Sequence, residues 1–270
     1  MKKVLFASTA LVLSAGVASA DGVTITGEAG FGITSTAGTT TIGNYLEYFI
    51  GASVATDSGI TVGASSDLAT AGAAGDSHDR EVYMSYEGLK LSVGNISNAA
   101  DDAGIADVGY GGLGVDNVAE GAVTYGGADV RVDYSFGDWA VAVSADSGNG
   151  AGQDDWAIGF SGSISGVSIF LGLDDNSGVQ GTAIGLGYSA GAVSVAASYE
   201  KAGAANSSGV SVAYTSGDVT VTAAYAQSTA AANDAYGIGV SYDLGGATLD
   251  GGFAEVGGAS VMDLGINFTF

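Results

Sequence analysis

Five carboxylates stand close together in one stretch of the sequence, residues 97–120, which contains no lysine or arginine. The acidic residues are Asp101, Asp102, Asp107, Asp116 and Glu120. Carboxylates gathered in a confined site attract cations, and oxygen ligands in a flexible loop suit calcium in particular. The stretch has neither helical nor strand periodicity, and a segment this long without regular structure tends to be functional. These residues are therefore the first candidates for a binding or constriction site.

Calcium is one candidate ligand, through Asp101, Asp102 and Asp107. Residues 111–116 also match the G-G-x-G-x-D calcium repeat, but that repeat works in stacked copies and stands here alone. A glycine-rich loop is the simpler interpretation of that run. The sequence therefore predicts no required cofactor and leaves Ca²⁺ at the three aspartates as an open hypothesis.

Catalytic residues are not evident. His78 is the only histidine, and the chain has no cysteine. A catalytic triad needs a nucleophile, a base and an orienting acid brought together, and no serine stands in a recognisable nucleophile setting. The sequence predicts that the protein is not an enzyme and that His78 is a solvated loop residue.

Apolar and polar residues alternate almost everywhere outside the acidic stretch, which is the pattern of amphipathic β-strands. We expect sixteen strands. The strand that follows the acidic stretch, within residues 121–136, has only a weak alternation of apolar and polar residues. The alternative is therefore a strand count two lower or two higher. The expected strands centre on residues 23–33, 46–54, 60–64, 82–86, 89–93, 130–134, 139–143, 156–160, 167–173, 184–188, 193–199, 210–214, 219–225, 236–242, 247–253 and 264–270.

Short and long connections alternate along the chain, which is typical of a bacterial outer-membrane barrel. The expected long loops are residues 35–44, 68–79, 97–120, 147–153, 175–179, 202–207, 229–234 and 257–260. The fold class is thus all-β, a transmembrane antiparallel β-barrel of sixteen strands, a size that encloses an aqueous channel. The apolar faces should meet lipid, because water in the lumen can solvate the carboxylates of the opposite faces.

Strand parity predicts which side chains line the pore. The pore-lining candidates are Glu28, Glu47, Lys90, Arg131 and Asp133. Parity also turns Glu200 and Asp263 toward the solvated lumen. Phe49, Tyr83 and Phe170 are the few aromatic residues that point inward, which is too few for a carbohydrate slide.

Residues 1–20 read as a signal peptide, with Lys2 and Lys3 before an apolar run and Ala18-Ser19-Ala20 at the cleavage site. The mature barrel domain should then comprise residues 21–270. It keeps four basic residues, Arg80, Lys90, Arg131 and Lys201, against 29 acidic ones. This acidity argues against nucleic acid as a partner and favours cations.

Several blocks of the sequence resemble the alphaproteobacterial general porins. The blocks are TGEAGFGI, REVYMSYEGLKLSVGN before the acidic stretch, VRVDYSFGDWAVAVSAD after it, and the terminal Phe270. The resemblance implies a homotrimer of sixteen-stranded barrels, each with its third extracellular loop, residues 97–120 by position, folded inward as a constriction. It also implies recognition of Phe270 by the barrel assembly machinery, and related porins depend on calcium.

The sequence departs from the family in the charges that create an electric field across the pore. In such porins, loop carboxylates face arginines across the pore, whereas this sequence has Gly30 in the first strand where an arginine is often found. Parity turns only Lys90 and Arg131 inward. We expect a passive diffusion channel for small hydrophilic solutes and ions, seated in outer-membrane lipid and preferring cations. The alternatives are a substrate-selective channel and a non-conducting structural or adhesive barrel.

Overall fold

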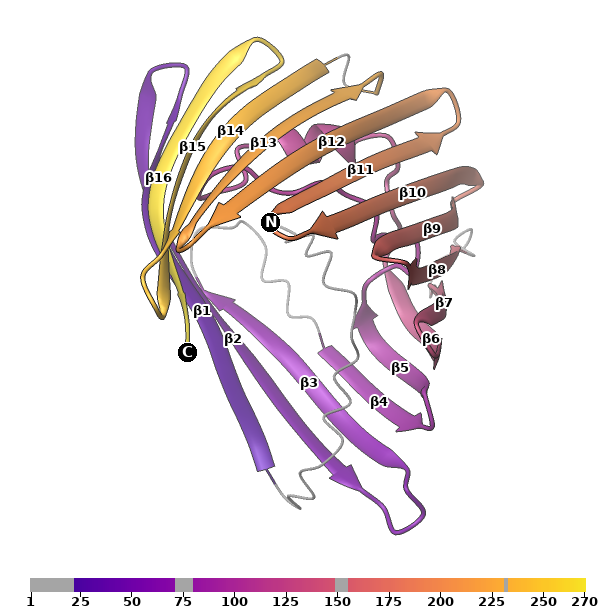
Figure 1. Ribbon diagram of the computed structural model, residues 1–270. Coiled ribbons are helices and arrows are strands. Elements are labelled where there is room, and N and C mark those ends of the chain that lie inside the picture. The colour runs from indigo at the N-terminus through magenta and orange to yellow at the C-terminus, as the bar shows by residue number, and fades with distance from the viewer. Residues whose placement is uncertain (1–21, 71–79, 149–154, 231–232) are drawn as a thin grey trace.

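The computed structural model describes residues 22–70, 80–148, 155–230 and 233–270, which form a closed barrel of sixteen antiparallel strands (Figure 1). The predicted signal peptide, residues 1–20, lies outside the described residues, as does His78. The elements are β1 (Gly22–Thr36), β2 (Thr39–Ala55), β3 (Thr61–Thr70), β4 (Arg80–Tyr86), β5 (Leu89–Ile96), α1 (Val115–Ala119), β6 (Ala128–Phe136), β7 (Trp139–Ala145), β8 (Trp156–Ile164), β9 (Val167–Asn176), β10 (Val179–Ala190), β11 (Val193–Ala202), β12 (Ala205–Ser216), β13 (Val219–Ser228), β14 (Asn233–Asp243), β15 (Ala247–Val256) and β16 (Ala259–Thr269).

Each strand pairs with its neighbours in the chain, and β1 closes the ring by pairing with β16. The predicted strand count is confirmed, and the weakly marked strand is β6. Closure gives each of the described strands a neighbour on both sides, as a sheet in lipid requires. At the junction, Phe270 and Gly27 exchange backbone hydrogen bonds of 2.8 and 2.9 Å.

The two ends of the barrel differ in their connections. The turn end holds the connections at residues 56–60, 87–88, 137–138, 165–166, 191–192, 217–218 and 244–246, together with Phe270. The loop end holds the others. There the predicted long loops 35–44, 175–179, 202–207 and 257–260 are wrong, because each is a two-residue turn between longer strands.

Residues 35–44 show why these loop predictions failed. The threonines of this polar stretch continue the β1–β2 ladder as far as the pair Thr36 and Thr39. β-Branched side chains favour extended backbone whatever their polarity. Gly38 supplies the positive φ, 84°, that the tight turn requires. Polarity at this end therefore marks strands that leave the lipid, not a change of secondary structure.

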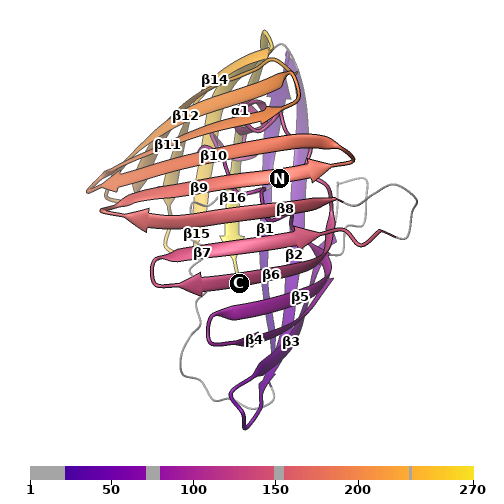
Figure 2. The ribbon, with the colours of Figure 1, turned by 90° about the vertical axis from the view of Figure 1, so that its right-hand side faces the viewer.

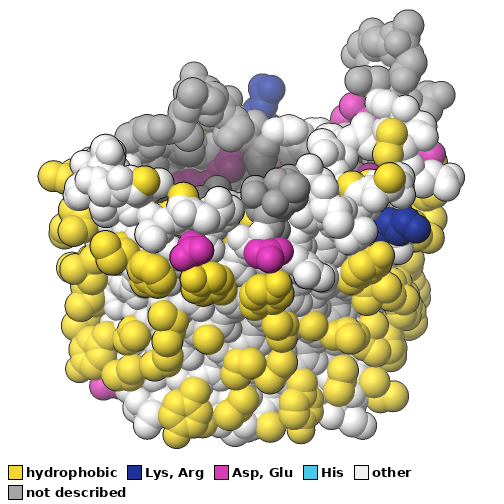
Figure 3. All heavy atoms as spheres, turned by 90° about the horizontal axis from the view of Figure 1, so that it is seen from above, with side chains coloured by type: hydrophobic (Ala, Val, Ile, Leu, Met, Phe, Trp, Pro, Cys, Tyr) yellow, Lys and Arg dark blue, Asp and Glu magenta, His cyan; other side chains and the backbone are white. Residues whose placement is uncertain are grey.

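The outer face carries the apolar halves of the strands. Val23, Phe31 and Leu186 are 67%, 56% and 45% exposed, in agreement with the predicted lipid-facing parity. Hydrophobic side chains form a broad band across the face seen in Figure 3, and most of the acidic side chains visible there lie above the band. In the described part of the chain, no helix is both long enough and apolar enough to span a membrane.

The buried core lies inside the barrel, against one side of the wall. Ile105, Val108 and Val115 have no exposed surface, and all three belong to the connection between β5 and β6. This connection and α1 lie within the ring of strands in Figures 1 and 2. The largest fully buried apolar side chains of the described residues therefore belong to an inserted segment and pack between it and the barrel wall.

Candidate functional site: an acidic segment on the inner wall

Residues 97–127, here called the lumen segment, run along the inner wall and return. The outgoing arm passes Ser144 of β7, Ser211 of β12 and Asp263 of β16. The return arm contains α1, which packs against β11 to β15. The segment leaves the inner faces of β2 to β5 facing it across the lumen. The structure thus places the acidic stretch against one side of the barrel lumen.

Wall side chains satisfy the backbone of the lumen segment. Hydroxyl and carboxylate oxygens accept hydrogen bonds from backbone N–H groups that regular structure does not pair, which is the usual requirement for buried backbone. The pairs are Ala99 N to Ser144 Oγ (2.9 Å), Ala106 N to Ser211 Oγ (2.9 Å), Gly111 N to Asp263 Oδ2 (2.6 Å), Ala122 N to Ser207 Oγ (3.1 Å) and Val123 N to Glu200 Oε2 (3.3 Å).

Glycines on the wall make room for this close approach. A Cβ atom at Gly159 would lie 2.0 Å from the Ala99 carbonyl oxygen, and one at Gly239 would lie 2.6 Å from the Gly109 nitrogen. At Gly265 it would lie 2.3 Å from the ring of Tyr110. The segment can lie flat on the wall because these positions have no side chain.

Gly159→Ala should therefore displace the start of the lumen segment and lower the free energy of unfolding by about 1 to 3 kcal/mol, the usual range for an overpacked site. Thermal unfolding of the detergent-solubilised barrel measures this change. Gly51→Ala on β2 is the control, since a Cβ there meets no atom within 4 Å. Equal melting of the two variants would contradict the packing described here.

The five predicted acidic residues do not act as one group. Asp102 and Asp107 are exposed to the lumen, Asp101 and Glu120 are half-buried, and Asp116 is buried. The Asp107 and Asp116 carboxylates lie on the same side of the segment, because both approach a Cβ placed at Gly112, at 3.2 and 3.8 Å. Asp102 instead lies near Arg131 of β6. Partial removal from water raises the pKa of Asp102 to about 6, and the positive charge of Arg131 limits this rise.

Burial and neighbouring charges shift the titration of the α1 region. Loss of water around Glu120 raises its pKa to about 8, and the charges of Asp116, Glu200, Asp101 and Asp107 act in the same direction. Burial also raises the pKa of Asp116. Part of this acidic segment is therefore protonated near neutral pH.

The predicted pore-lining residues lie on β1, β2, β5 and β6. Glu28 of β1 and Glu47 of β2 are directly opposite each other in the sheet. Lys90 Nζ lies 2.5 Å from Glu81 Oε1. Arg131 Nη2 lies 2.9 Å from Asp133 Oδ1. Each inward base predicted from parity is thus ion-paired with a carboxylate of its own wall.

Arg131 also reaches the lumen segment, because its Nη1 donates to the Ser97 carbonyl at 3.2 Å. The guanidinium therefore fixes the point where the segment leaves β5. Together with its ion pair to Asp133, this contact makes Arg131 part of the support of the segment as well as of the pore lining.

Two functional side chains were misjudged from the sequence. Glu200 and Asp263, expected in solvated positions, are 0% and 7% exposed because the lumen segment covers them. Phe170 is likewise buried against Ala103 and does not line the channel. Parity gave their inward direction correctly, but nothing local in the sequence shows which part of the wall a distant segment covers.

The predicted calcium ligands do not assemble in this structure. Among the described residues, no three His, Cys, Asp or Glu side chains are placed to hold a metal ion. Asp102 lies toward Arg131, whereas Asp107 lies beside Asp116.

Comparisons with known proteins agree with this architecture. The sequence model of a family described as Gram-negative porin matches residues 7–261. Three similar solved structures are mutants of the porin from Rhodopseudomonas blastica, with TM-scores of 0.79, 0.79 and 0.77. Each is 21% identical in sequence, and each match covers 92% of this chain and 100% of that one. No curated protein sequence matches this chain significantly.

Proposed function

We propose that this chain, which belongs to the Gram-negative porin family, is a cation-preferring diffusion channel. It would admit small hydrophilic solutes and ions across the outer membrane. No reaction is involved. Solutes are limited in size where the lumen segment narrows the barrel, and the charge of the walls biases which ions pass.

The placement of the charged side chains carries the cation preference. Asp102 and Asp107 are exposed on the lumen segment, and Glu28 and Glu47 stand on the other wall. The inward bases Lys90 and Arg131 are offset by Glu81 and Asp133. Net negative charge therefore remains on both sides of the passage, and carboxylates in a confined aqueous path raise the local cation concentration.

The protein's partners follow from family membership. We propose a homotrimer in outer-membrane lipid, with the C-terminal Phe270 recognised by the barrel assembly machinery. The ring of Phe270 packs edge-on against Tyr48 at 5.9 Å on the outer face, where it is 53% exposed and accessible to such a partner.

Calcium binding to Asp101, Asp102 and Asp107 stays a prediction. It is tested by measuring the thermal stability of the protein as Ca²⁺ is added.

Reversal potentials test the proposed selectivity. The purified protein in a planar bilayer, under a tenfold KCl gradient, should show a potential of the sign that K⁺ permeation gives. The double variant Asp102→Asn with Asp107→Asn should bring this potential closer to zero. Anion selectivity of the unaltered protein would overturn the proposal.

Two other functions are separable in the same bilayer. A substrate-selective channel would show saturable block by one solute, whereas a diffusion channel should exclude a series of sugars by size alone. A structural or adhesive barrel would give no channels.

A further inference from the structure

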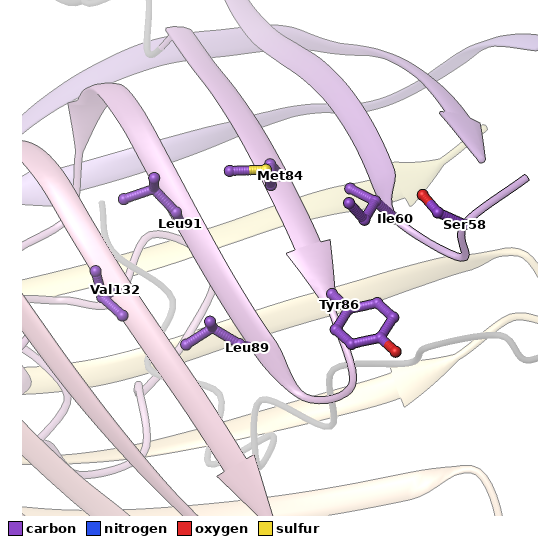
Figure 4. Close-up of a pocket in the computed structure, with 7 residues that line it drawn as sticks. All are labelled: Ser58, Ile60, Met84, Tyr86, Leu89, Leu91 and Val132. Atoms are coloured by element: carbon purple, nitrogen blue, oxygen red, sulfur yellow. The ribbon is translucent and has the colours of Figure 1, made fainter. Parts of the chain in front are cut away.

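One ammonium group of the chain is held on the inner wall of the barrel. Met84 of β4 and Leu89 of β5 line an apolar groove on the outer face (Figure 4). Side chains alternate along a strand, so the adjacent Tyr83 and Lys90 point into the lumen. Lys90 Nζ lies 4.7 Å from the centre of the Tyr83 ring and 2.5 Å from Glu81 Oε1. An aromatic face and a carboxylate together bind this ammonium group.

The wall itself positions the ring and the carboxylate of this site. Gly63 of β3 is directly opposite Tyr83 in the sheet, and a Cβ atom there would overlap the tyrosine ring. The ring can therefore lie over the backbone with one face toward the lumen. The Glu81 carboxylate accepts hydrogen bonds from the hydroxyl groups of Ser92 and Ser65, which hold it beside the ring.

A second tyrosine is arranged in the same way on β2. Tyr45 points inward in addition to the aromatic residues predicted from parity, and it is directly opposite Gly30 of β1. A Cβ atom at Gly30 would lie 2.6 Å from Cε1 of the Tyr45 ring. The Tyr45 hydroxyl donates to Asn267 Oδ1 at 2.9 Å, and Asn267 Nδ2 donates to Asp250 Oδ2 at 2.9 Å. This chain of hydrogen bonds fixes the ring on the wall.

Carboxylates surround the second ring as well. Glu28, Glu47 and Asp250 all lie close enough to the Tyr45 hydroxyl to act on it electrostatically. Glu28 and Glu47 are directly opposite each other in the sheet, which places their Cβ atoms about 5 Å apart. The sequences of β1, β2, β15 and β16 contain no lysine or arginine. These strands therefore supply no counterpart of Lys90 beside Tyr45.

The second ring lies where the lumen segment meets the wall. Tyr110 of that segment rests on Gly32 of β1, where a Cβ atom would lie 2.7 Å from its ring, and Tyr45 is close enough to act on it electrostatically. Both tyrosines keep part of their surface exposed. A solute that passes between the lumen segment and the facing wall therefore passes the Tyr45 ring.

We propose that Tyr45 and the three carboxylates beside it form a binding site for small organic solutes that carry a primary ammonium group. The ring attracts the cation and the carboxylates accept its N–H donors, as the Tyr83 site does for Lys90. Because the site occupies one wall, it enriches such solutes in the passage without closing it. The inference rests on the proposed function, for which it names a class of solute.

Two isomeric cations test the proposal. n-Butylammonium and tetramethylammonium have the same atoms and the same charge, but only the first can donate hydrogen bonds to carboxylates. Their permeability ratio is measured as a reversal potential in a planar bilayer with one cation on each side. The unaltered channel should favour n-butylammonium at least threefold more than Tyr45→Leu does. Tyr83→Leu is the matched control and should keep the ratio, because the Tyr83 ring also lies over a glycine but already holds Lys90.

Charge variants separate this site from a general cation preference. Glu47→Gln should lower the isomer ratio at least twofold. Asp107→Asn should lower the preference for K⁺ over Cl⁻ and leave the isomer ratio unchanged. Lys90→Ala vacates the Tyr83 site and should raise the isomer ratio. Glu47→Gln and Lys90→Ala also provide the test should Tyr45→Leu fail to fold, as judged by circular dichroism.

Failure of this inference is distinguishable from failure of the proposed function. Equal isomer ratios for the unaltered protein, Tyr45→Leu and Glu47→Gln would overturn the ammonium site even in a channel that prefers K⁺ to Cl⁻. A protein that forms no channels would contradict the proposed function instead. Saturation-transfer NMR of n-butylammonium with the detergent-solubilised barrel then tests the site alone. A signal that Tyr45→Leu abolishes supports the site, and no signal from the unaltered protein overturns it.

Discussion

Replacing Glu200 by alanine is expected to detach the return arm of the lumen segment and to give a noisier channel of larger mean conductance. The carboxylate of Glu200 has no exposed surface and accepts hydrogen bonds from Val123 N at 3.3 Å and from the Tyr125 hydroxyl at 2.9 Å. The alanine variant leaves both donors without this acceptor and creates a cavity beneath the segment. A buried donor without a partner costs about 1 to 3 kcal/mol, so docking of the arm should weaken by several kcal/mol in total.

Single-channel recording measures this effect as an increase in conductance and in open-channel fluctuations. Glu255→Ala is a matched control, because Glu255 also accepts a tyrosine hydroxyl, that of Tyr236 at 2.9 Å, but at an exposed position. This control should conduct normally. Glu200→Gln keeps the shape of the side chain and an acceptor oxygen. It should therefore show conductance and open-channel fluctuations close to those of the unaltered protein. If Glu200→Ala conducts like the unaltered protein, Glu200 does not hold the segment.

The sequence was sufficient for the barrel itself. Period-two alternation gave the number of strands and the face of each one that meets lipid, because both depend on neighbouring residues. The loop-end boundaries failed where Thr36 and Thr39 extend a ladder beyond the apolar band. Polarity reports the position of the membrane, whereas strand length depends on pairing.

The path of the lumen segment could not be predicted from local pattern. Its anchors are distant in sequence: the Gly111 nitrogen binds an aspartate 152 residues away. The fit also depends on absent side chains at positions such as Gly159 and Gly265, and a glycine in a strand carries no local sign that another segment will lie on it. Which carboxylates of the segment face water follows from this fit, so the sequence could not separate them.

Raising the pH is expected to have the second large effect, an increase in the cation selectivity of the channel. Glu120, whose ordinary pKa is 4.5, has its pKa raised to about 8 by burial and by the surrounding carboxylates. It is protonated in the folded channel at neutral pH, so it adds no charge to the lumen segment there. Above pH 8 it ionises, and the cation-to-anion permeability ratio should rise about twofold or more, in a step with its midpoint near pH 8.

The raised pKa of Glu120 also determines whether the stability of the fold rises or falls with pH. Between pH 4.5 and about 8 the folded state holds the Glu120 proton and the unfolded chain does not. The stabilisation is therefore present in full below pH 4.5 and is lost as pH rises through this window. The thermal midpoint of the unaltered protein should fall between pH 5 and 8 by more than that of Glu120→Gln.

Reversal potentials recorded from pH 5 to 10 separate Glu120 from the other carboxylates. Glu120→Gln should abolish the step near pH 8. Asp102→Asn should lower cation preference above about pH 6, where Asp102 is ionised, and should keep the step near pH 8, because Asp102 titrates separately beside Arg131. A step that persists in Glu120→Gln would assign the titration to another group, and a flat profile in the unaltered protein would show that the segment holds no proton at neutral pH.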